Sequence, residues 1–135
     1  MERRINRGIE RTGTLPRGKI TLFYTTITPA PPGVSRATLI IVHGLSEHGG
    51  RYLKLQGELA RKGFSSWAYD QRGFGKSTGR RTYVADYHEL LDDLQAMINE
   101  ARATLPPAEP LLLMAHSLGG AVVAPFCIDA SHAVD

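Results

Sequence analysis

One serine in the sequence lies where a nucleophile is expected. Residues 115–120 read Ala-His-Ser-Leu-Gly-Gly, follow a short apolar run and precede a helical pattern. This is a near match to G-x-S-x-G, in which a sharp turn between a strand and a helix lifts the serine hydroxyl out of the backbone. Gly119 gives Ser117 the small neighbour that this turn requires, Ala115 adds one methyl group, and Gly120 allows close packing of helix and strand. The alternative is a serine that only caps the helix.

A second loop offers the complementary part of a serine-based site. His43-Gly44-Leu45 follows another short apolar run. In acyl transfer the negative charge that develops on the substrate oxygen is held by two backbone N–H groups, one of them from the residue after the nucleophile. We therefore expect oxyanion donors at Leu45 and Leu118. We interpret His43 as a structural histidine, and Gly44 and His116 as support for the two loops.

A third loop looks like a phosphate-binding loop but fails the test. Residues 70–77 read Asp-Gln-Arg-Gly-Phe-Gly-Lys-Ser. A Walker A motif requires glycine where Asp70 stands, and a dinucleotide fingerprint requires its third glycine where Thr78 stands. We interpret the segment as a structural turn in which the charges of Asp70 and Arg72 are paired locally.

Apolar runs and helical patterns alternate along the chain. Strands are predicted at residues 20–27, 38–42, 64–69 and 111–114, and helices at 51–62, after residue 86 and from residue 119 onward. This alternation predicts an α/β fold with a mostly parallel sheet and helices on its faces. Ligands bind at the carboxyl ends of such strands, and all three loops follow a strand there.

The helices carry two further signals. Asp86 is predicted to cap the second helix, with Glu89 three residues later completing a capping box. Pro125 falls about two turns into the last helix, where proline removes a hydrogen bond. We expect that helix to kink or to end early.

Charge is unevenly distributed over the 135 residues. The chain has 16 basic and 13 acidic side chains, but residues 1–19 alone hold six basic and two acidic ones. The rest of the chain is therefore slightly acidic, and no basic face of the domain indicates nucleic-acid binding. We predict a basic flexible arm over residues 1–18 and a folded domain over residues 19–135.

Cofactor and location are predicted from what the sequence lacks. His43 and His48 do not form the His-Glu-x-x-His pattern of a zinc site, so neither a metal nor another cofactor is expected. The single cysteine, Cys127, favours a reducing compartment. No apolar run suits a secretory signal or a membrane-spanning helix. These features predict a cytoplasmic protein, with peripheral membrane contact left open.

The three loops together resemble a known family. His43-Gly44-Leu45-Ser46-Glu47-His48-Gly49-Gly50-Arg51-Tyr52, the 69–77 segment and the 115–120 segment are similar in order and spacing to the monoacylglycerol lipase / lysophospholipase branch of the α/β-hydrolases, also called serine aminopeptidase-like. The Glu-His-x-x-Arg-Tyr extension is more specific than the general fold signature. A serine at position 117 also argues against the dehalogenase and epoxide-hydrolase relatives, which use aspartate there.

The resemblance implies a fold and an activity. The fold would be a three-layer α/β-hydrolase domain with a mostly parallel sheet, truncated after the nucleophile-elbow helix. The activity would be hydrolysis of small lipid esters, monoacylglycerols or lysophospholipids, with Ser117 as nucleophile. An amide- or peptide-cleaving relative and a non-catalytic remnant are the alternatives.

The resemblance also shows a departure. In this fold the acid and the histidine of the catalytic triad follow the serine along the chain, but only 18 residues follow Ser117. His132 and Asp135 are too far along a helix to reach it, and the side chain of His116 should point away. We therefore expect the N-terminal half of a hydrolase domain, without triad acid and base, that needs a C-terminal half for activity.

Overall fold

The computed structural model describes residues 2–5, 8–30 and 35–129. The described residues form one mixed sheet with helices on both faces. The elements are β1 (Glu2–Ile5), β2 (Gly8–Arg17), β3 (Ile20–Pro29), β4 (Thr38–Val42), the 3-10 turn η1 (Gly49–Tyr52), α1 (Leu53–Arg61), β5 (Ser65–Tyr69), α2 (His88–Arg102), β6 (Leu111–Ala115) and α3 (Leu118–Ile128).

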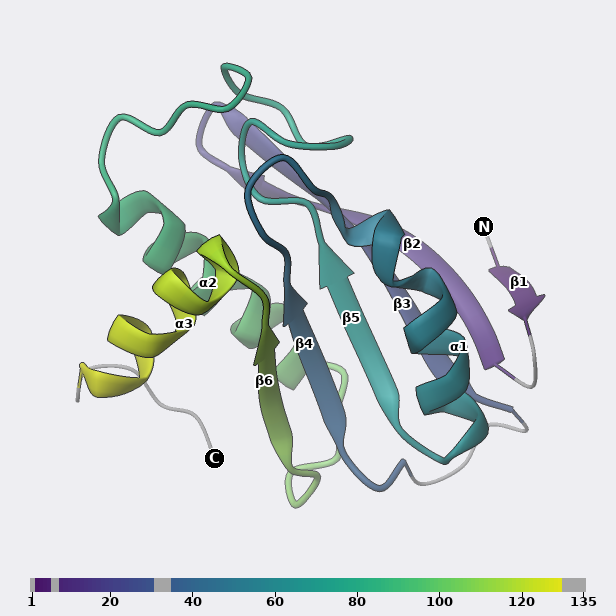
Figure 1. Ribbon diagram of the computed structural model, residues 1–135. Coiled ribbons are helices and arrows are strands. Elements are labelled where there is room, and N and C mark those ends of the chain that lie inside the picture. The colour runs from purple at the N-terminus through teal and green to yellow at the C-terminus, as the bar shows by residue number, and fades with distance from the viewer. Residues whose placement is uncertain (1, 6–7, 31–34, 130–135) are drawn as a thin grey trace.

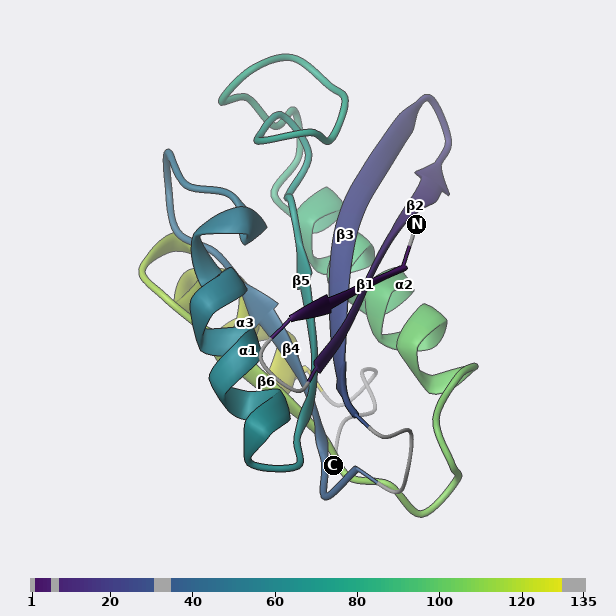
Figure 2. The ribbon, with the colours of Figure 1, turned by 90° about the vertical axis from the view of Figure 1, so that its right-hand side faces the viewer.

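The strands lie in the order β1-β2-β3-β5-β4-β6. The neighbours β5, β4 and β6 are parallel, whereas β1, β2 and β3 extend the sheet with antiparallel pairs. Helix α1 covers one face and α2 covers the other, which gives three layers (Figure 1, Figure 2). The predicted α/β class is confirmed, and β4, β5 and β6 lie within two residues of their predicted bounds.

Residues 1–18 were predicted to be a flexible basic arm, but the described residues 2–5 and 8–17 of this segment are strands of the sheet. Strand β2 pairs with β3 along its whole length, from Gly8 opposite Pro29 to Arg17 opposite Ile20, and Gly18 makes the hairpin turn with a φ of 61°. The prediction was wrong because β2 is an antiparallel strand near an edge, where polar side chains alternate with few apolar ones. The charged composition of this strand is similar to that of a flexible tail, but its backbone is paired in the sheet.

The main core lies between the sheet and the helices α2 and α3. Alternate residues of β4 and β5 point to this side, so Ile40, Val42 and Trp67 pack against the apolar stripe of α2. Four residues predicted to line that stripe are buried: Leu90, Leu94, Met97 and Ala101. Helix α3 adds Val122 and Phe126 to the same core.

The 70–84 loop holds its charges differently from the prediction. Asp70 and Arg72 are not paired with each other. The carboxylate of Asp70 accepts the backbone N–H groups of Gly49 (2.6 Å) and Lys76 (2.7 Å). Arg72 instead reaches the buried carboxylate of Asp93 on α2, with bonds of 2.7 and 2.8 Å. The loop is therefore a structural turn, as predicted, but it is tied to α2.

The start of α2 and the end of α3 differ in detail from the prediction. Asp86 accepts the backbone N–H of His88 (2.9 Å), yet Glu89 does not complete a capping box, because its carboxylate pairs with Arg72 (3.0 Å). Helix α3 continues past Pro125 to Ile128, so the expected early end is wrong.

Helix α3 tolerates its proline because a side chain replaces the missing donor. Pro125 has no N–H, so the carbonyl of Ala121, four residues earlier, lacks its helical partner. The hydroxyl of Tyr87, at the start of α2, donates a hydrogen bond to that carbonyl. The substitute bond also joins α2 to α3.

We expect Tyr87→Phe to destabilise the protein by about 1 kcal/mol, the typical contribution of one hydrogen bond. In a Pro125→Ala background, the restored backbone N–H at position 125 binds the Ala121 carbonyl, so removal of the hydroxyl has a much smaller effect. Urea unfolding of wild type, the two single variants and the double variant measures the coupling free energy between positions 87 and 125. Equal losses in both backgrounds would contradict this account.

Candidate active site

Ser117 lies on a strained turn between β6 and α3. Its φ of 53° and ψ of −115° place a residue with a side chain in a region that is disfavoured by roughly 1–3 kcal/mol. The residue is exposed, and its side chain makes no capping hydrogen bond to the helix. A capping serine has extended backbone and accepts a helix N–H. Ser117 is therefore not an ordinary N-cap.

Gly119 makes the turn possible. A Cβ atom at this position would lie 2.1 Å from the carbonyl oxygen of Val42 and 2.9 Å from that of His43. The start of α3 therefore sits directly on the end of β4, as the sequence pattern predicts. The prediction for Gly120 was wrong, because a Cβ there would meet nothing within 4 Å. Ala115 is exposed, so its methyl group is accommodated.

The parallel pairing of β4 and β6 brings the first and third loops together. Val42 is opposite Ala115 in the register, and the N–H of His116 donates to the Val42 carbonyl (3.2 Å). Where the loops touch, a Cβ on Gly44 would lie 3.1 Å from Nδ1 of His116. The two loops that carry the predicted oxyanion donors are therefore in contact.

The two predicted donors have free amide groups. Within the described part of the chain, the backbone N–H groups of Leu45 and Leu118 have no hydrogen-bond acceptor. Leu118 is the first residue of α3, where the helix dipole favours an anion. The side chain of Leu45 is 61% exposed, so its loop is open to solvent.

Glu47 organises the first loop, and sequence reasoning did not assign it a role. Its Oε2 accepts the backbone N–H of Gly44 (2.7 Å) and the hydroxyl of Tyr52 (3.0 Å). Nδ1 of His116 lies 3.3 Å from the same oxygen, and Arg51 lies 3.6 Å from Oε1. The Glu-His-x-x-Arg-Tyr extension contained a signal for this role. Arg51 and Tyr52 belong to the extension, and Gly44 lies three residues before it.

His43 is a structural histidine, as predicted. Its ring is fully buried: Nε2 accepts the N–H of Gln71 (2.9 Å) and Nδ1 lies 2.7 Å from the Gly44 carbonyl. Burial lowers the pKa of His43, which favours the neutral ring that this arrangement requires. The ring joins the end of β4 to the loop after β5.

The described residues show no general base bonded to Ser117. Its hydroxyl has no hydrogen-bond partner among them, and the Nδ1 of His116 is directed to Glu47. Asp129 is exposed at the end of α3, and His132 and Asp135 lie outside the described residues.

Within the residues that the structure describes, no group of three His, Cys, Asp or Glu side chains is arranged to hold a metal ion. No described helix is long and apolar enough to cross a membrane.

The fold is that of an α/β-hydrolase, truncated after the helix that follows β6. A monoglyceride lipase from Saccharomyces cerevisiae, solved with a substrate analogue, superimposes with a TM-score of 0.76 at 23% identity, over 89% of this chain and 40% of that one. A carboxyl esterase from Bacillus coagulans gives a TM-score of 0.78 at 20% identity, over 93% and 42%. Residues 33–135 match the serine aminopeptidase S33 family, and the chain belongs to this family.

Sequence relatives refine the branch. The chain is 31% identical over 106 residues to a monoacylglycerol lipase of Mycolicibacterium smegmatis, covering 78% of this chain and 37% of that protein. It is 36% identical over 92 residues to a monoglyceride lipase of Rattus norvegicus, covering 68% and 30%. The resemblance to the monoacylglycerol lipase branch is thus confirmed, and the chain spans about a third of these relatives' length.

The two neighbouring glycines provide a matched test of the turn. We expect Gly119→Ala to destabilise the protein by about 1–3 kcal/mol, because the new methyl group overlaps the β4 carbonyl. Gly120→Ala should stabilise it by about 0.5–1 kcal/mol, since alanine is the better helix former and meets no obstacle. Thermal and urea unfolding measure both effects. Similar effects from the two substitutions would show that α3 does not rest on β4.

Glu47 gives the first loop a pH dependence. The Gly44 N–H, with Tyr52 and His116, lowers the pKa of Glu47 from 4.5 to about 2. The folded loop therefore prefers the carboxylate, so its stabilising effect is complete above pH 4.5 and is lost as the pH falls towards 2. We expect wild type to lose stability relative to Glu47→Gln across this interval in urea unfolding. If the free energy of unfolding of the two proteins changed with pH in the same way, this assignment would be contradicted.

Proposed function

We propose that this chain carries the nucleophile and oxyanion hole of a serine hydrolase that cleaves carboxylic esters of lipids, of the monoacylglycerol lipase or lysophospholipase type. The observation that carries the proposal is the backbone of Ser117, whose left-handed turn leaves an exposed hydroxyl without an internal partner. Strain of this kind persists where the surroundings enforce it, and it is concentrated at functional sites.

The chemistry follows from three groups. The Ser117 hydroxyl attacks the ester carbonyl and forms a tetrahedral intermediate, whose oxygen becomes negatively charged. The free N–H groups of Leu45 and Leu118 are the proposed donors to that oxygen, and each such donor contributes roughly 2.7–4 kcal/mol to the transition state. The alcohol then leaves, and water releases the acyl group from the serine.

The nucleophile also requires a base to take its proton. We propose that the acid and histidine of the triad come from a part of the hydrolase domain outside this chain, because they follow the serine in this fold. The comparison with relatives of which the chain covers about a third supports this division. Glu47 is not the acid of the triad in this proposal; it holds the loop that presents the Leu45 amide.

We expect the 135-residue chain alone to be nearly inactive. Loss of the base lowers turnover on the order of 10⁶-fold and leaves about 10³–10⁴-fold catalysis over water. Hydrolysis of a short-chain nitrophenyl ester and labelling by a fluorophosphonate, each compared with Ser117→Ala, measure this. Rapid turnover that depends on Ser117 would overturn the half-domain proposal and leave the nucleophile assignment intact.

The nucleophile and substrate class are tested in a chimera. Residues 1–128 are followed by the triad acid- and histidine-bearing part of the Mycolicibacterium smegmatis lipase, with Ser117→Ala as the control. We expect hydrolysis of monoacylglycerol that the substitution abolishes. The family description, a serine aminopeptidase, makes a peptide amide the competing substrate. Preferential amide cleavage would overturn the lipid-ester proposal, and a folded chimera whose activity survives Ser117→Ala would overturn the nucleophile assignment.

A further inference from the structure

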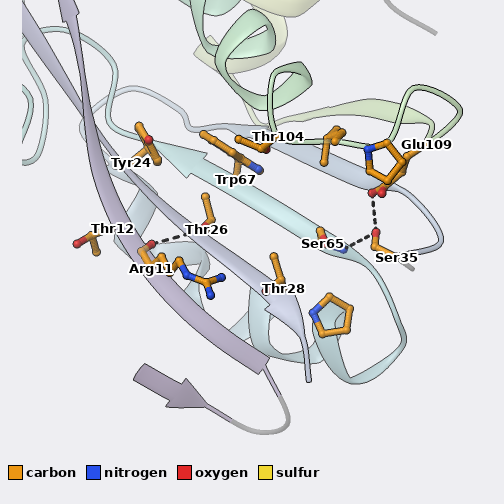
Figure 3. A pocket seen from close by; sticks show the side chains of 13 residues that line it. Arg11, Thr12, Tyr24, Thr26, Thr28, Ser35, Ser65, Trp67, Thr104 and Glu109 are labelled. Carbon is orange, nitrogen blue, oxygen red and sulfur yellow. Dashed lines mark hydrogen bonds between the residues drawn. The ribbon is translucent and has the colours of Figure 1, made fainter. Parts of the chain in front are cut away.

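A pocket lies at the opposite end of the sheet from Ser117. It has a volume of about 460 Å³ and lies between β3, β5 and the segment that follows α2 (Figure 3). Ser65 and Trp67 line it near the amino end of β5, whereas the loops of the candidate active site follow the carboxyl ends of β4 and β6. The pocket falls within the usual 300–1,000 Å³ range for small-molecule sites.

An aromatic pair forms one wall of this pocket. The rings of Tyr24 and Trp67 stack with centroids 4.7 Å apart. The Tyr24 ring lies across Gly13 of the neighbouring strand, where a Cβ would be 2.4 Å from its Cζ atom. Gly13 thus leaves room for the ring beside the pocket. The wall offers a flat apolar surface against which C–H groups pack.

Unused hydrogen-bonding groups line the same pocket. Trp67 is 6% exposed, and its indole N–H has no partner among the described residues. In the close view the indole nitrogen is directed into the pocket (Figure 3). The hydroxyls of Thr28 and Ser65 also have no partner within the described ranges. These groups line the pocket without an internal partner, so they are available to a ligand that carries hydroxyls.

The two charged side chains of the pocket already have partners. Glu109 is 8% exposed, and its Oε1 accepts the hydroxyls of Ser35 and Thr38, both at 2.7 Å. Arg11, at the other side, pairs with Glu2 at 2.8 Å. The other polar side chains that line the pocket carry neutral hydroxyls and one indole N–H. A ligand matched to them is uncharged, carries several hydroxyls and has a C–H face.

We propose that this pocket binds a neutral polyol of the size of glycerol or a monosaccharide. Hydroxyls of the ligand accept from the Trp67 N–H and exchange hydrogen bonds with Thr28 and Ser65, since a hydroxyl both donates and accepts. Its C–H groups pack on the Tyr24–Trp67 wall. The site is independent of Ser117, so the outcome of its test leaves the proposed hydrolase function unaffected.

Trp67 is the single tryptophan of the chain, which makes the pocket directly observable. Titration of the ¹⁵N-labelled chain with glycerol, and separately with glucose, should shift the indole N–H resonance saturably, with a dissociation constant on the order of 1–10 mM. 1-Propanol, which has the carbon skeleton of glycerol but one hydroxyl, should give no saturable shift. No saturation with either polyol, or equal saturation with 1-propanol, would overturn the proposal.

Variants separate the pocket from general solvent effects. Thr28→Val and Ser65→Ala should each weaken polyol binding about fivefold, the effect of one lost hydrogen bond. Thr14→Val changes an exposed residue of β2 outside the pocket and should leave binding unchanged. The fingerprint spectrum verifies that each variant is folded. Unchanged affinity in folded Thr28→Val and Ser65→Ala proteins would overturn the assignment.

Discussion

The contact between the start of α3 and the end of β4 is the constraint on which the rest of the site depends. The helix begins so close to the Val42 carbonyl that only glycine fits at position 119, and the chain reaches this contact through a left-handed residue at Ser117. A relaxed turn would move the hydroxyl into a capping position on the helix. Close packing against a rigid parallel strand therefore keeps the serine strained, exposed and free of internal partners.

The loop after β4 completes this arrangement from the other side. Its N–H at Gly44 is held by Glu47, which also contacts His116 beside the serine. The His43 ring, buried below, connects the loop to Gln71 after β5. Three loops that are distant in sequence are thus fixed to one another at the edge where parallel strands end, which is where this class of fold places its ligands.

The sequence predicted those parts of the fold and site that have strong local signals. Short apolar runs marked β4, β5 and β6, because parallel strands with helices on both faces of the sheet are rich in apolar residues. The roles of Gly119 and His43 followed from their positions next to strand ends. In contrast, β2 was mistaken for a tail, because an antiparallel strand near an edge keeps its charges in solvent.

Side-chain partners were the part that local patterns did not reveal. Arg72 was assigned to Asp70 because the two are close in sequence, whereas it binds Asp93, 21 residues away on α2. Glu89 was assigned to a cap and instead joins this pair. Glu47 was quoted only as part of a motif. Each of these contacts depends on how α2 and the loops pack, which is a property of the tertiary structure.

The strand order has a consequence for how the molecule assembles. Strand β5 lies between β3 and β4, although both precede it in the sequence. During synthesis from the N-terminus, the β2–β3 hairpin and the apolar strand β4 therefore emerge before the element that joins them exists. Formation of the sheet waits for the chain to pass Tyr69, and this requirement for non-local pairing favours slow folding with an exposed intermediate that chaperones would recognise.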